Sequence, residues 1–439
     1  MKPVDKTENS IRALIIAEQA NPEWTSVPLE GWSHWQALNS ITFAHLVTQI
    51  RNEGALLREN VSRSEFTAVD SERVAKVIWR LTQLFRGGIG RGWTTVMALS
   101  TISYQYFERL VWLQFRERLL RREFDLVHRI TPLSPTMPST LARRCAGIGV
   151  PFLMGPLNGG LPWPRGFDSV RRQEGEWLSY FRGAYKLAPG YTATRKYASA
   201  IIAGSQATLL QIPEKYRDKC VYIPENGIDP KRFSRQSEKP QIPPLRVAFV
   251  GRLVPYKGAD ILLEAAAPLV RQGCVIVELI GDGPQMPALT ALVARENIAN
   301  GVKVRGSLPH TELQNWLGTV HVLGFPSIRE FGGAVVLESM ALGVIPVVID
   351  YGGPGELITS STGFKLPLGS RQELIESYRN ILTNLLQEPS KLTVMSQNAR
   401  ERVFRHFTWD AKARQVHEVY LWVLGRRAEK PEFGMPIGQ

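Results

Sequence analysis

The sequence predicts an α/β protein made of two doubly wound, Rossmann-like domains, each built on a parallel sheet, that face each other across a cleft. Three observations support this fold class. Apolar, β-rich segments alternate with segments of helical periodicity along both halves of the chain. A polar, proline-rich stretch, SRQSEKPQIPP at 234–244, separates the halves as a linker would. The length of 439 residues allows two domains that each bury a core.

The first half contains short apolar runs, bounded by turn or cap residues, that are typical of buried strands. They lie at 12–18, 45–50, 125–130, 150–155, 198–205 and 219–229. Apolar periodicity predicts helices at 71–86, 94–122 and 140–149. A further helix is expected to start near Ser33, after a loop that contains Gly31. We assign residues 1–233 to an N-terminal domain.

The second half restarts the same alternation after the linker. Strands are predicted at 245–251, 274–283, 302–306, 320–326 and 346–350. Helices are predicted at 259–273, 286–297, 310–319 and 334–343. We assign residues 245–407 to a C-terminal domain. Parallel sheets of this kind bind ligands at the carboxyl ends of their strands.

The net charge of +13 is concentrated in the first half of the chain. Residues 1–240 carry +11, and 71–200 alone carry +12, whereas residues 241–439 carry +2. A basic domain attracts phosphate-bearing substrates, nucleic acid or an anionic membrane surface. Arginines at 116–122 and 194–197 lie among leucine and tyrosine, but no nucleic-acid motif accompanies them. We therefore favour a membrane surface or a lipid-diphosphate acceptor over nucleic acid, with a merely solvated basic face as the alternative.

Three scattered cysteines, Cys145, Cys220 and Cys274, show no metal-ligand spacing and favour a reducing environment. The N-terminus has no secretory signal pattern, and no apolar run approaches the roughly 18 residues that a spanning helix needs. We expect a cytoplasmic protein, with peripheral association on the cytoplasmic membrane face as an option.

The stretch PSIREFGGAVVLESMALG at 326–343 combines acidic residues, glycines and an apolar helix pattern. Glu330 lies on a loop just beyond the carboxyl end of a predicted strand. Gly332 and Gly333 leave bare N–H groups at the start of the next helix, which favours anion binding. Glu338 lies about one and a half turns into that helix, where a carboxylate can reach the hydroxyls of a ribose. Together these features predict a nucleotide-sugar site.

In these residues the sequence resembles the retaining GT-B glycosyltransferases of family 4, also called glycosyl transferases group 1, over roughly 198–424. Members carry two glutamates separated by seven residues, which here are Glu330 and Glu338. VGRLVPYKGADILLEA at 250–265 is similar to the family's donor-phosphate segment. The resemblance implies that Arg252 and Lys257 bind the donor diphosphate.

The resemblance also implies a full set of site residues. The catalytic set is Arg252, Lys257 and Glu330, with Glu330 on the donor sugar. The donor-binding set is Gly251, Arg305, Gly306, Phe331, Gly332, Gly333, Ala334 and Glu338. In this set Glu338 holds the ribose, and backbone near Arg305 and Gly306 contacts the base. No Asp-x-Asp pair occurs, so we expect no obligatory metal and no cofactor besides the nucleotide-sugar substrate.

The N-terminal half binds the acceptor in the family that the chain resembles, and there the likeness is weaker. Its candidates are Gly31, His128, Asn158 and Gly159. Gly31 stands where many members have a glycine pair, and Ile130 replaces a second histidine after His128, so His128 can also be a packed strand residue. Asn158 stands where relatives often carry a histidine. The resemblance further implies that a helix at 408–425 packs back on this domain.

We therefore predict a retaining hexosyltransferase that moves a sugar from a nucleotide-sugar to an acceptor hydroxyl of a glycan or lipid-linked acceptor, in the synthesis of a cell-surface polysaccharide or glycolipid. The leaving diphosphate is expected to help to deprotonate the acceptor. An inert nucleotide-binding scaffold of a polysaccharide assembly complex is the alternative from another class. An epimerase or a phosphorylase is disfavoured by the glutamate pair and by the lack of a Schiff-base lysine motif. The donor base, the sugar, the acceptor and the oligomeric state stay open.

Overall fold

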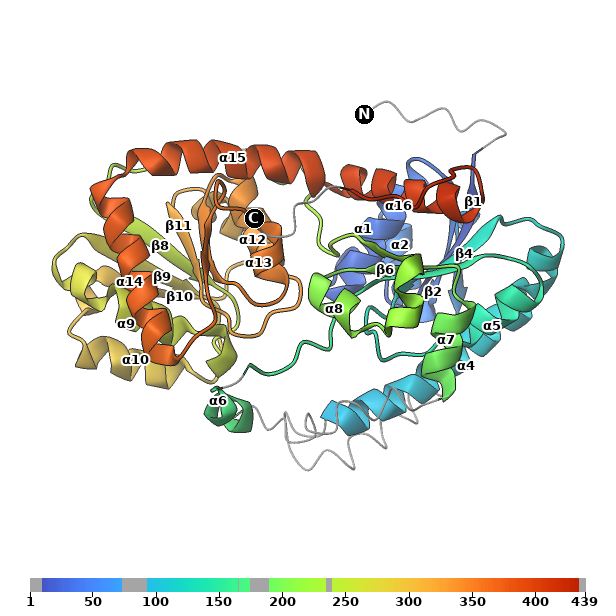
Figure 1. The fold of residues 1–439 in the computed structure, drawn as a ribbon, viewed down its shortest axis with the longest axis horizontal. Helices are drawn as coiled ribbons and strands as arrows, with labels where there is room; N and C mark the ends of the chain where they lie inside the picture. The colour runs from blue at the N-terminus through green and yellow to red at the C-terminus, as the bar shows by residue number, and fades with distance from the viewer. Residues whose placement is uncertain (1–9, 73–92, 165, 174–188, 234–238, 434–439) are drawn as a thin grey trace. The chain divides into compact units, whose positions relative to one another are not determined.

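The computed structural model describes residues 10–72, 93–164, 166–173, 189–233 and 239–433 (Figure 1). The chain divides into two compact units. Unit 1 holds the described residues within 1–160, 175–225 and 409–434, and unit 2 holds those within 161–174 and 226–408. Among the described residues, no helix has both the length and the apolar character needed to cross a membrane.

Unit 1 is built on a seven-stranded sheet in the order β3-β2-β1-β4-β5-β6-β7, in which every pair of neighbours is parallel. Its strands are β1 (Arg12–Ala17), β2 (Phe43–Gln49), β3 (Phe66–Val69), β4 (Leu126–Thr131), β5 (Phe152–Leu157), β6 (Ala200–Ala203) and β7 (Cys220–Tyr222). Because β1 pairs with both β2 and β4, the winding direction reverses there, as in a doubly wound fold.

The described helices of unit 1 cover both faces of this sheet. They are α1 (Val27–Asn39), α2 (Glu53–Arg58), α4 (Trp93–Leu120), α5 (Thr140–Gly147), α7 (Pro189–Tyr197), α8 (Gln206–Gln211) and α16 (Trp409–Val423), with short 3-10 turns η1 (Ile50–Asn52) and η4 (Glu214–Lys219). One apolar core includes side chains of α1 and α16, and a second, on the other side, includes side chains of α4 and α5. Both faces being covered explains why β4 and β5 are buried along their whole length.

Unit 2 repeats the design with a six-stranded parallel sheet in the order β10-β9-β8-β11-β12-β13. Its strands are β8 (Leu245–Val250), β9 (Val275–Ile280), β10 (Val302–Gly306), β11 (Val322–Phe325), β12 (Ile345–Ile349) and β13 (Phe364–Leu366). Here the winding reverses at β8, which pairs with β9 and with β11. The carboxyl ends of β8 and β11 therefore meet at the switch point, where ligands bind in open α/β sheets.

The described helices of unit 2 are α6 (Asp168–Gln173), α9 (Ala259–Arg271), α10 (Met286–Arg295), α11 (His310–Leu317), α12 (Ala334–Ala341), α13 (Gly353–Leu357), α14 (Arg371–Gln387) and α15 (Ser390–His406), with 3-10 turns η5 (Pro255–Lys257) and η6 (Ala299–Gly301). The start of α14 shows how local sequence fixes an element. The Ser370 hydroxyl accepts from the Glu373 backbone N–H while the Glu373 carboxylate accepts from the Ser370 N–H, which is a capping box.

The structure confirms the two parallel α/β sheets and differs from the sequence prediction in local detail. The strands β3 and β13 were not predicted, because polar residues, Thr67 and Lys365, interrupt their short apolar runs. The helix α1 begins at Val27 rather than near Ser33, since Pro28 is compatible with the first turn of a helix. Most of the helix predicted at 71–86 lies outside the described residues.

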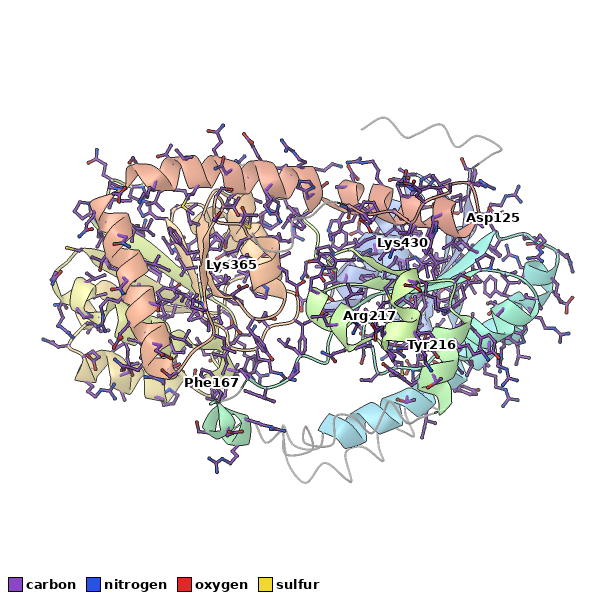
Figure 2. All side chains as sticks on the ribbon, in the orientation of Figure 1. Asp125, Phe167, Tyr216, Arg217, Lys365 and Lys430 are labelled. Carbon is purple, nitrogen blue, oxygen red and sulfur yellow. The ribbon has the colours of Figure 1, made fainter. Side chains whose placement is uncertain are left out.

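The division of the chain also differs from the predicted boundaries at residues 161–174 and 226–233. The sequence placed both segments in the first domain, but their described residues belong to unit 2. Phe167 is 5% exposed and belongs to the apolar core of unit 2. Figure 2 labels this residue directly before α6. The helix α16 belongs to unit 1, next to α1. We call residues 161–173 the docked segment.

Candidate functional site

The loop from β8 to α9 brings two basic residues to the switch point of the unit 2 sheet. Gly251 and Arg252 follow β8 directly, and the Arg252 side chain is exposed. The turn η5 then places Lys257 just before α9. Gly258 has a φ of 73°, and a Cβ there would lie 2.4 Å from the carbonyl oxygen of Pro326. Glycine thus lets the loop close against the end of β11.

Lys257 and Glu330 form an ion pair at this place, although they are far apart in sequence. Both side chains are largely buried, with 14% and 17% of their area exposed. The Lys257 ammonium also lies 5.1 Å from the centre of the Phe325 ring. The partial burial strengthens the electrostatic interaction relative to a surface pair. The structure therefore brings together two of the three residues that the sequence assigned to catalysis.

The helix α12 begins beside this pair without a side-chain cap. Its N-cap is Gly333, whose φ of 72° suits glycine and which offers no side chain to the first N–H groups. Ala334 is exposed at the first helical position, and Gly332 is half-buried on the loop before it. Glu338 lies one turn further on, half-buried, and helical side chains lean towards the helix start. Such a helix start can hold an anion.

A second loop fixes the backbone around Glu330. Glu330 and Gly352, which follows β12, form a parallel backbone bridge. The N–H of Gly353 donates to the Glu330 carbonyl oxygen at 3.3 Å. The loops that follow β11 and β12 are thus side by side. This contact holds Glu330 in place through its backbone and leaves its carboxylate for Lys257.

Arg305 lies near the carboxyl end of β10, and its side chain binds Glu278. Its guanidinium donates to the carboxylate of Glu278, which is fully buried on β9. Arg246 and the Trp316 indole donate to the same carboxylate at 2.9 and 3.2 Å. Burial opposes ionisation of Glu278, but the two arginines outweigh it and lower the pKa of Glu278. The Arg305 side chain is thus structural, and any contact with a base is left to backbone near Gly306.

The docked segment lies against the loops that carry Lys257 and Glu330. The sequence analysis did not predict this contact. Arg329 donates to the Leu161 carbonyl oxygen at 3.1 Å, and its guanidinium lies 4.9 Å from the Trp163 ring centre. The Arg329 guanidinium also lies 5.3 Å from the centre of the Phe331 ring. The Tyr351 hydroxyl donates to the carbonyl oxygen of Pro162 at 2.8 Å. Arg329, directly before Glu330, was the available signal, but the Trp163 ring beside it stands 166 positions earlier in the sequence.

In unit 1, Gly31 lies in the helix α1 and not in a loop, which corrects the prediction. It is buried, and a Cβ there would lie 2.1 Å from the carbonyl oxygen of Gln19. Glycine therefore allows α1 to pack closely on the segment after β1. The close approach is made to the protein's own backbone.

His128 is fully buried in β4, and both of its ring nitrogens have partners. Nδ1 lies 2.7 Å from the Tyr420 hydroxyl of α16, and Nε2 lies 2.7 Å from the carbonyl oxygen of Gly155. Burial, with the charge of Arg129, lowers the pKa of His128 to about 4 despite the Gly155 contact. This is the packed strand histidine that the sequence left open as an alternative.

Asn158 follows β5 directly and is 7% exposed. Its Oδ1 accepts from the Gly159 N–H at 2.9 Å and from the Ser205 hydroxyl at 3.1 Å. Its Nδ2 has no hydrogen-bond partner among the described residues. A buried amide N–H without a partner costs free energy, so a ligand group that accepts from it would be favoured. The role of Asn158 and Gly159 on the acceptor side stays a prediction.

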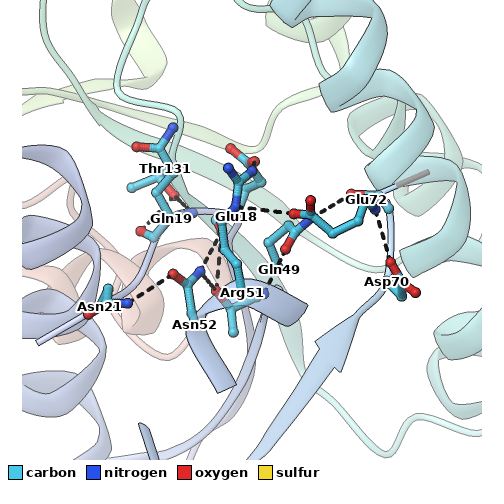
Figure 3. Close-up of polar contacts among 11 residues, drawn as sticks. Glu18, Gln19, Asn21, Gln49, Arg51, Asn52, Asp70, Glu72 and Thr131 are labelled. Carbon is cyan, nitrogen blue, oxygen red and sulfur yellow. Dashed lines mark hydrogen bonds and ion pairs between the residues drawn. The ribbon is translucent and has the colours of Figure 1, made fainter. Parts of the chain in front are cut away.

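Polar side chains also meet at the carboxyl ends of β1, β2 and β3, where no motif was recognised (Figure 3). Arg51 donates to the Glu18 carboxylate at 2.9 Å, and Gln49 donates to Glu72 at 2.7 Å. Burial raises the pKa of Glu18 against the opposing effect of Arg51. These residues come from three separate segments, which is why the sequence alone did not group them.

A metal site was not expected from the sequence. Among the residues that the structure describes, no three His, Cys, Asp or Glu side chains lie close enough together to hold a metal ion. The expectation of a metal-independent reaction stays a prediction.

Comparisons with known proteins find similarities over the part of the chain that contains this site. Residues 230–402 match the model described as glycosyl transferases group 1. The glycogen synthase of Mycobacterium tuberculosis is 29% identical over 222 residues, which are 49% of this chain and 52% of that protein. The D-inositol 3-phosphate glycosyltransferase of Thermobispora bispora is 31% identical, covering 40% of this chain and 43% of that protein. The chain thus spans about half the length of the curated relatives it matches.

A solved structure extends the likeness to both units. HepE of Anabaena, crystallised in complex with UDP, aligns with a TM-score of 0.60 at 17% identity, covering 93% of this chain and 99% of that one. At this identity the likeness concerns the fold. The match at 230–402 contains Lys257, Glu330 and Glu338. Residues 230–402 are therefore similar to the glycosyl transferases group 1 family, within a chain that has the GT-B fold.

Proposed function

We propose that the chain transfers a hexosyl group from a nucleotide-sugar to an acceptor hydroxyl with retention of anomeric configuration. The observation that carries this proposal is the ion pair of Lys257 and Glu330 beside the uncapped start of α12, at the switch point of the unit 2 sheet. A cation, a carboxylate and free helix N–H groups are what a sugar diphosphate needs. The family match over the same residues supports it.

In this proposal the positive groups stabilise the departing diphosphate. Negative charge on the leaving group grows in the transition state, so Arg252, Lys257 and the N–H groups after Gly333 lower the barrier. Glu338 accepts hydrogen bonds from the ribose hydroxyls. The leaving diphosphate itself accepts the acceptor's proton, which requires no protein base and no metal ion.

Glu330 has a second role in the proposal, because it competes for Lys257. A donor diphosphate carries more negative charge than a carboxylate, so it takes over the ammonium. Glu330 is then released to accept hydrogen bonds from the donor sugar. This predicts that Glu330→Gln binds the nucleoside diphosphate alone more tightly than the wild type, while it loses the additional affinity for the nucleotide-sugar. Isothermal titration with both ligands measures the two effects separately.

The first experiment is a thermal-shift panel of UDP, GDP and ADP with their common sugar conjugates. A ligand that binds the folded state raises the melting temperature by mass action. HepE, crystallised with UDP-glucose, and the glycosyltransferase names of several curated relatives make a nucleotide-sugar the expected ligand class. A clearly larger increase in melting temperature with one nucleotide would identify the class of the donor. No increase with any of them would count against the proposal.

The rival function is an inert nucleotide-binding scaffold. Donor hydrolysis or transfer by the purified protein, followed by mass spectrometry, separates the two, and the anomeric configuration of the product tests retention. The reaction in EDTA tests the expected independence of metal ions. Synthesis of a polysaccharide or glycolipid is the proposed context, with a glycan or lipid-linked acceptor.

A further inference from the structure

The outer face of α4 exposes large apolar side chains on the basic unit. Ile102, Leu113 and Leu120 are 55%, 65% and 45% exposed. They are three of nine large apolar side chains that are exposed among the described residues. Single exposed leucines are common on protein surfaces, but a group of three on one helix calls for an explanation.

These three side chains lie on one stripe of the helix together with two arginines. Arg109 and Arg116 are exposed as well. At about 100° per residue, positions 102, 109, 113, 116 and 120 all fall within about 60° of one another around the helix axis. We call these five residues the outer face of α4, on which apolar and basic side chains alternate.

The outer face is distinct from the side of α4 that packs in the core of unit 1. The packed side is formed by Tyr104, Phe107, Val111, Phe115 and Leu119, which are at most 3% exposed. The helix therefore contacts the core of unit 1 through its packed side, and these contacts do not involve the outer face. Figure 1 shows α4 as a long light-blue helix of unit 1 near α5.

Further exposed basic residues lie just after α4 and on α5. Arg121, at the end of α4, and Arg143 of the adjoining α5 are both exposed. Glu117 is the acidic neighbour on α4, and its carboxylate lies 4.0 Å from the Arg116 guanidinium. The stretch 71–200, which includes all of these residues, carries a net charge of +12.

We propose that the outer face of α4 docks on an anionic lipid surface. Leu113, Leu120 and Ile102 enter the boundary between headgroups and acyl chains, and the arginines between them contact lipid phosphates. Long arginine stems reach the phosphates while the helix lies flat, because the charged head can extend away from the apolar stem. The inference does not rest on the proposed glycosyl transfer.

A second copy of the chain is a poorer partner for this face. With Tyr106, the same residues follow a 4-3-4-3-4 spacing, as in the seam of a coiled coil. In a paired helix, however, Arg109 and Arg116 would occupy seam positions and bring like charges together in a desolvated place. An anionic surface provides partners for both the arginines and the leucines.

The test is sedimentation of the full chain with vesicles of phosphatidylcholine containing 30% phosphatidylglycerol, and with pure phosphatidylcholine vesicles. At low salt, we expect binding to the anionic vesicles only. Arg109→Gln with Arg116→Gln should lower the partition coefficient roughly thirtyfold, as expected for two basic residues at such a surface. Leu113→Gln should lower it about tenfold through the lost apolar contact.

Two control variants separate the outer face from net charge and from apolar exposure in general. Arg405→Gln with Arg414→Gln removes the same charge from exposed positions elsewhere, and Val394→Gln removes an apolar side chain that is 62% exposed. Both should bind vesicles nearly as the wild type does. The proposal is overturned if the wild type fails to sediment with anionic vesicles, or if the controls lose as much binding as the α4 variants. It is equally overturned if Leu113→Gln leaves sedimentation unchanged and instead converts a dimer into a monomer.

Discussion

Unit 2 draws most of its candidate ligand-binding residues from two short stretches of sequence, whereas unit 1 draws its polar strand-end residues from three separate segments. Lys257 lies six positions after Gly251, and Glu338 lies eight after Glu330. In unit 1, by contrast, Glu18, Gln49 and Glu72 follow or end three separate strands. Two similar sheets thus differ in how far apart along the chain their functional groups stand. Local motifs can be recognised in the first arrangement and not in the second.

The interiors of the two units differ as well. Unit 1 buries ionisable side chains throughout, including His34, His128, Arg129, Arg195 and Lys412, all at most 2% exposed. In the core of unit 2 the apolar side chains dominate, and the buried carboxylate of Glu278 is matched by two arginines. We therefore expect a fall of pH below about 6.5 to act mainly on unit 1, where burial lowers the pKa of His34 to about 3 and that of His128 to about 4.

The largest expected effect is that of Lys257→Ala on turnover. Removal of a preorganised cation from a growing negative charge should lower turnover of the donor roughly 10²-fold or more. Lys257→Arg should recover only part of it, since a guanidinium differs in shape from an ammonium. The exposed Lys303 on β10 is the matched control, and Lys303→Ala should have wild-type turnover. Equal rates for Lys257→Ala and wild type would remove Lys257 from the mechanism.

The next effect is a loss of stability of unit 1 at acidic pH. Burial lowers the pKa of His128 to about 4 and that of His34 to about 3, from an ordinary value of 6.5. As the pH falls below about 6.5, the unfolded chain takes up protons that the folded chain refuses, so stability is lost down to about pH 4. At about 1.4 kcal/mol per pH unit, His128 alone contributes up to about 3 kcal/mol.

Urea denaturation of wild type and His128→Gln at several pH values measures this effect. The variant keeps a hydrogen-bonding side chain but cannot be protonated. Its stability should fall less steeply between pH 6.5 and 4 than that of the wild type, even if it is lower at pH 7. Identical slopes would show that the pKa of His128 is the same in the folded and the unfolded chain.

These differences explain how much could be predicted from the sequence. The alternation of strands and helices predicted both sheets, and the glycines beside Glu330 predicted the start of α12 correctly. The contact of His128 with Tyr420 could not be predicted, because the two residues stand 292 positions apart. Gly31 was misplaced because Pro28 suggested a loop, although proline also suits the first turn of a helix. Contacts between remote segments carry no local signal.

A smaller effect is expected for Glu338→Ala, which tests the nucleotide end of the unit 2 site. Loss of a carboxylate that accepts from ribose hydroxyls should weaken nucleoside diphosphate binding about tenfold. Titration calorimetry with the nucleotide identified by thermal shift measures it. Glu312→Ala, on the first turn of α11, is a matched helical control that should bind normally. If Glu338→Ala binds the nucleoside diphosphate with unchanged affinity, Glu338 does not hold the ribose.

The smallest effect concerns Trp163, which tests whether the docked segment serves the sugar end of the site. Its ring lies 4.9 Å from the guanidinium of Arg329, directly before Glu330. Loss of this cation–π contact, about 1 kcal/mol, should weaken binding of the nucleotide-sugar about fivefold and leave the nucleoside diphosphate unaffected. Trp163→Phe should retain most of the affinity, and Trp24→Ala, at a site 45% exposed in unit 1, is the control.

The affinities of Trp163→Ala for the nucleotide-sugar and for the nucleoside diphosphate show what the docked segment does. If Trp163→Ala weakens both ligands equally, the segment supports unit 2 as a whole and has no preference for the sugar. If it lowers only the melting temperature, the segment is structural. A loss confined to the nucleotide-sugar would mean that a stretch encoded beside Asn158, in the first half of the sequence, helps to position Glu330 in the second. The site of unit 2 would then depend, like the strand ends of unit 1, on residues that no local motif connects.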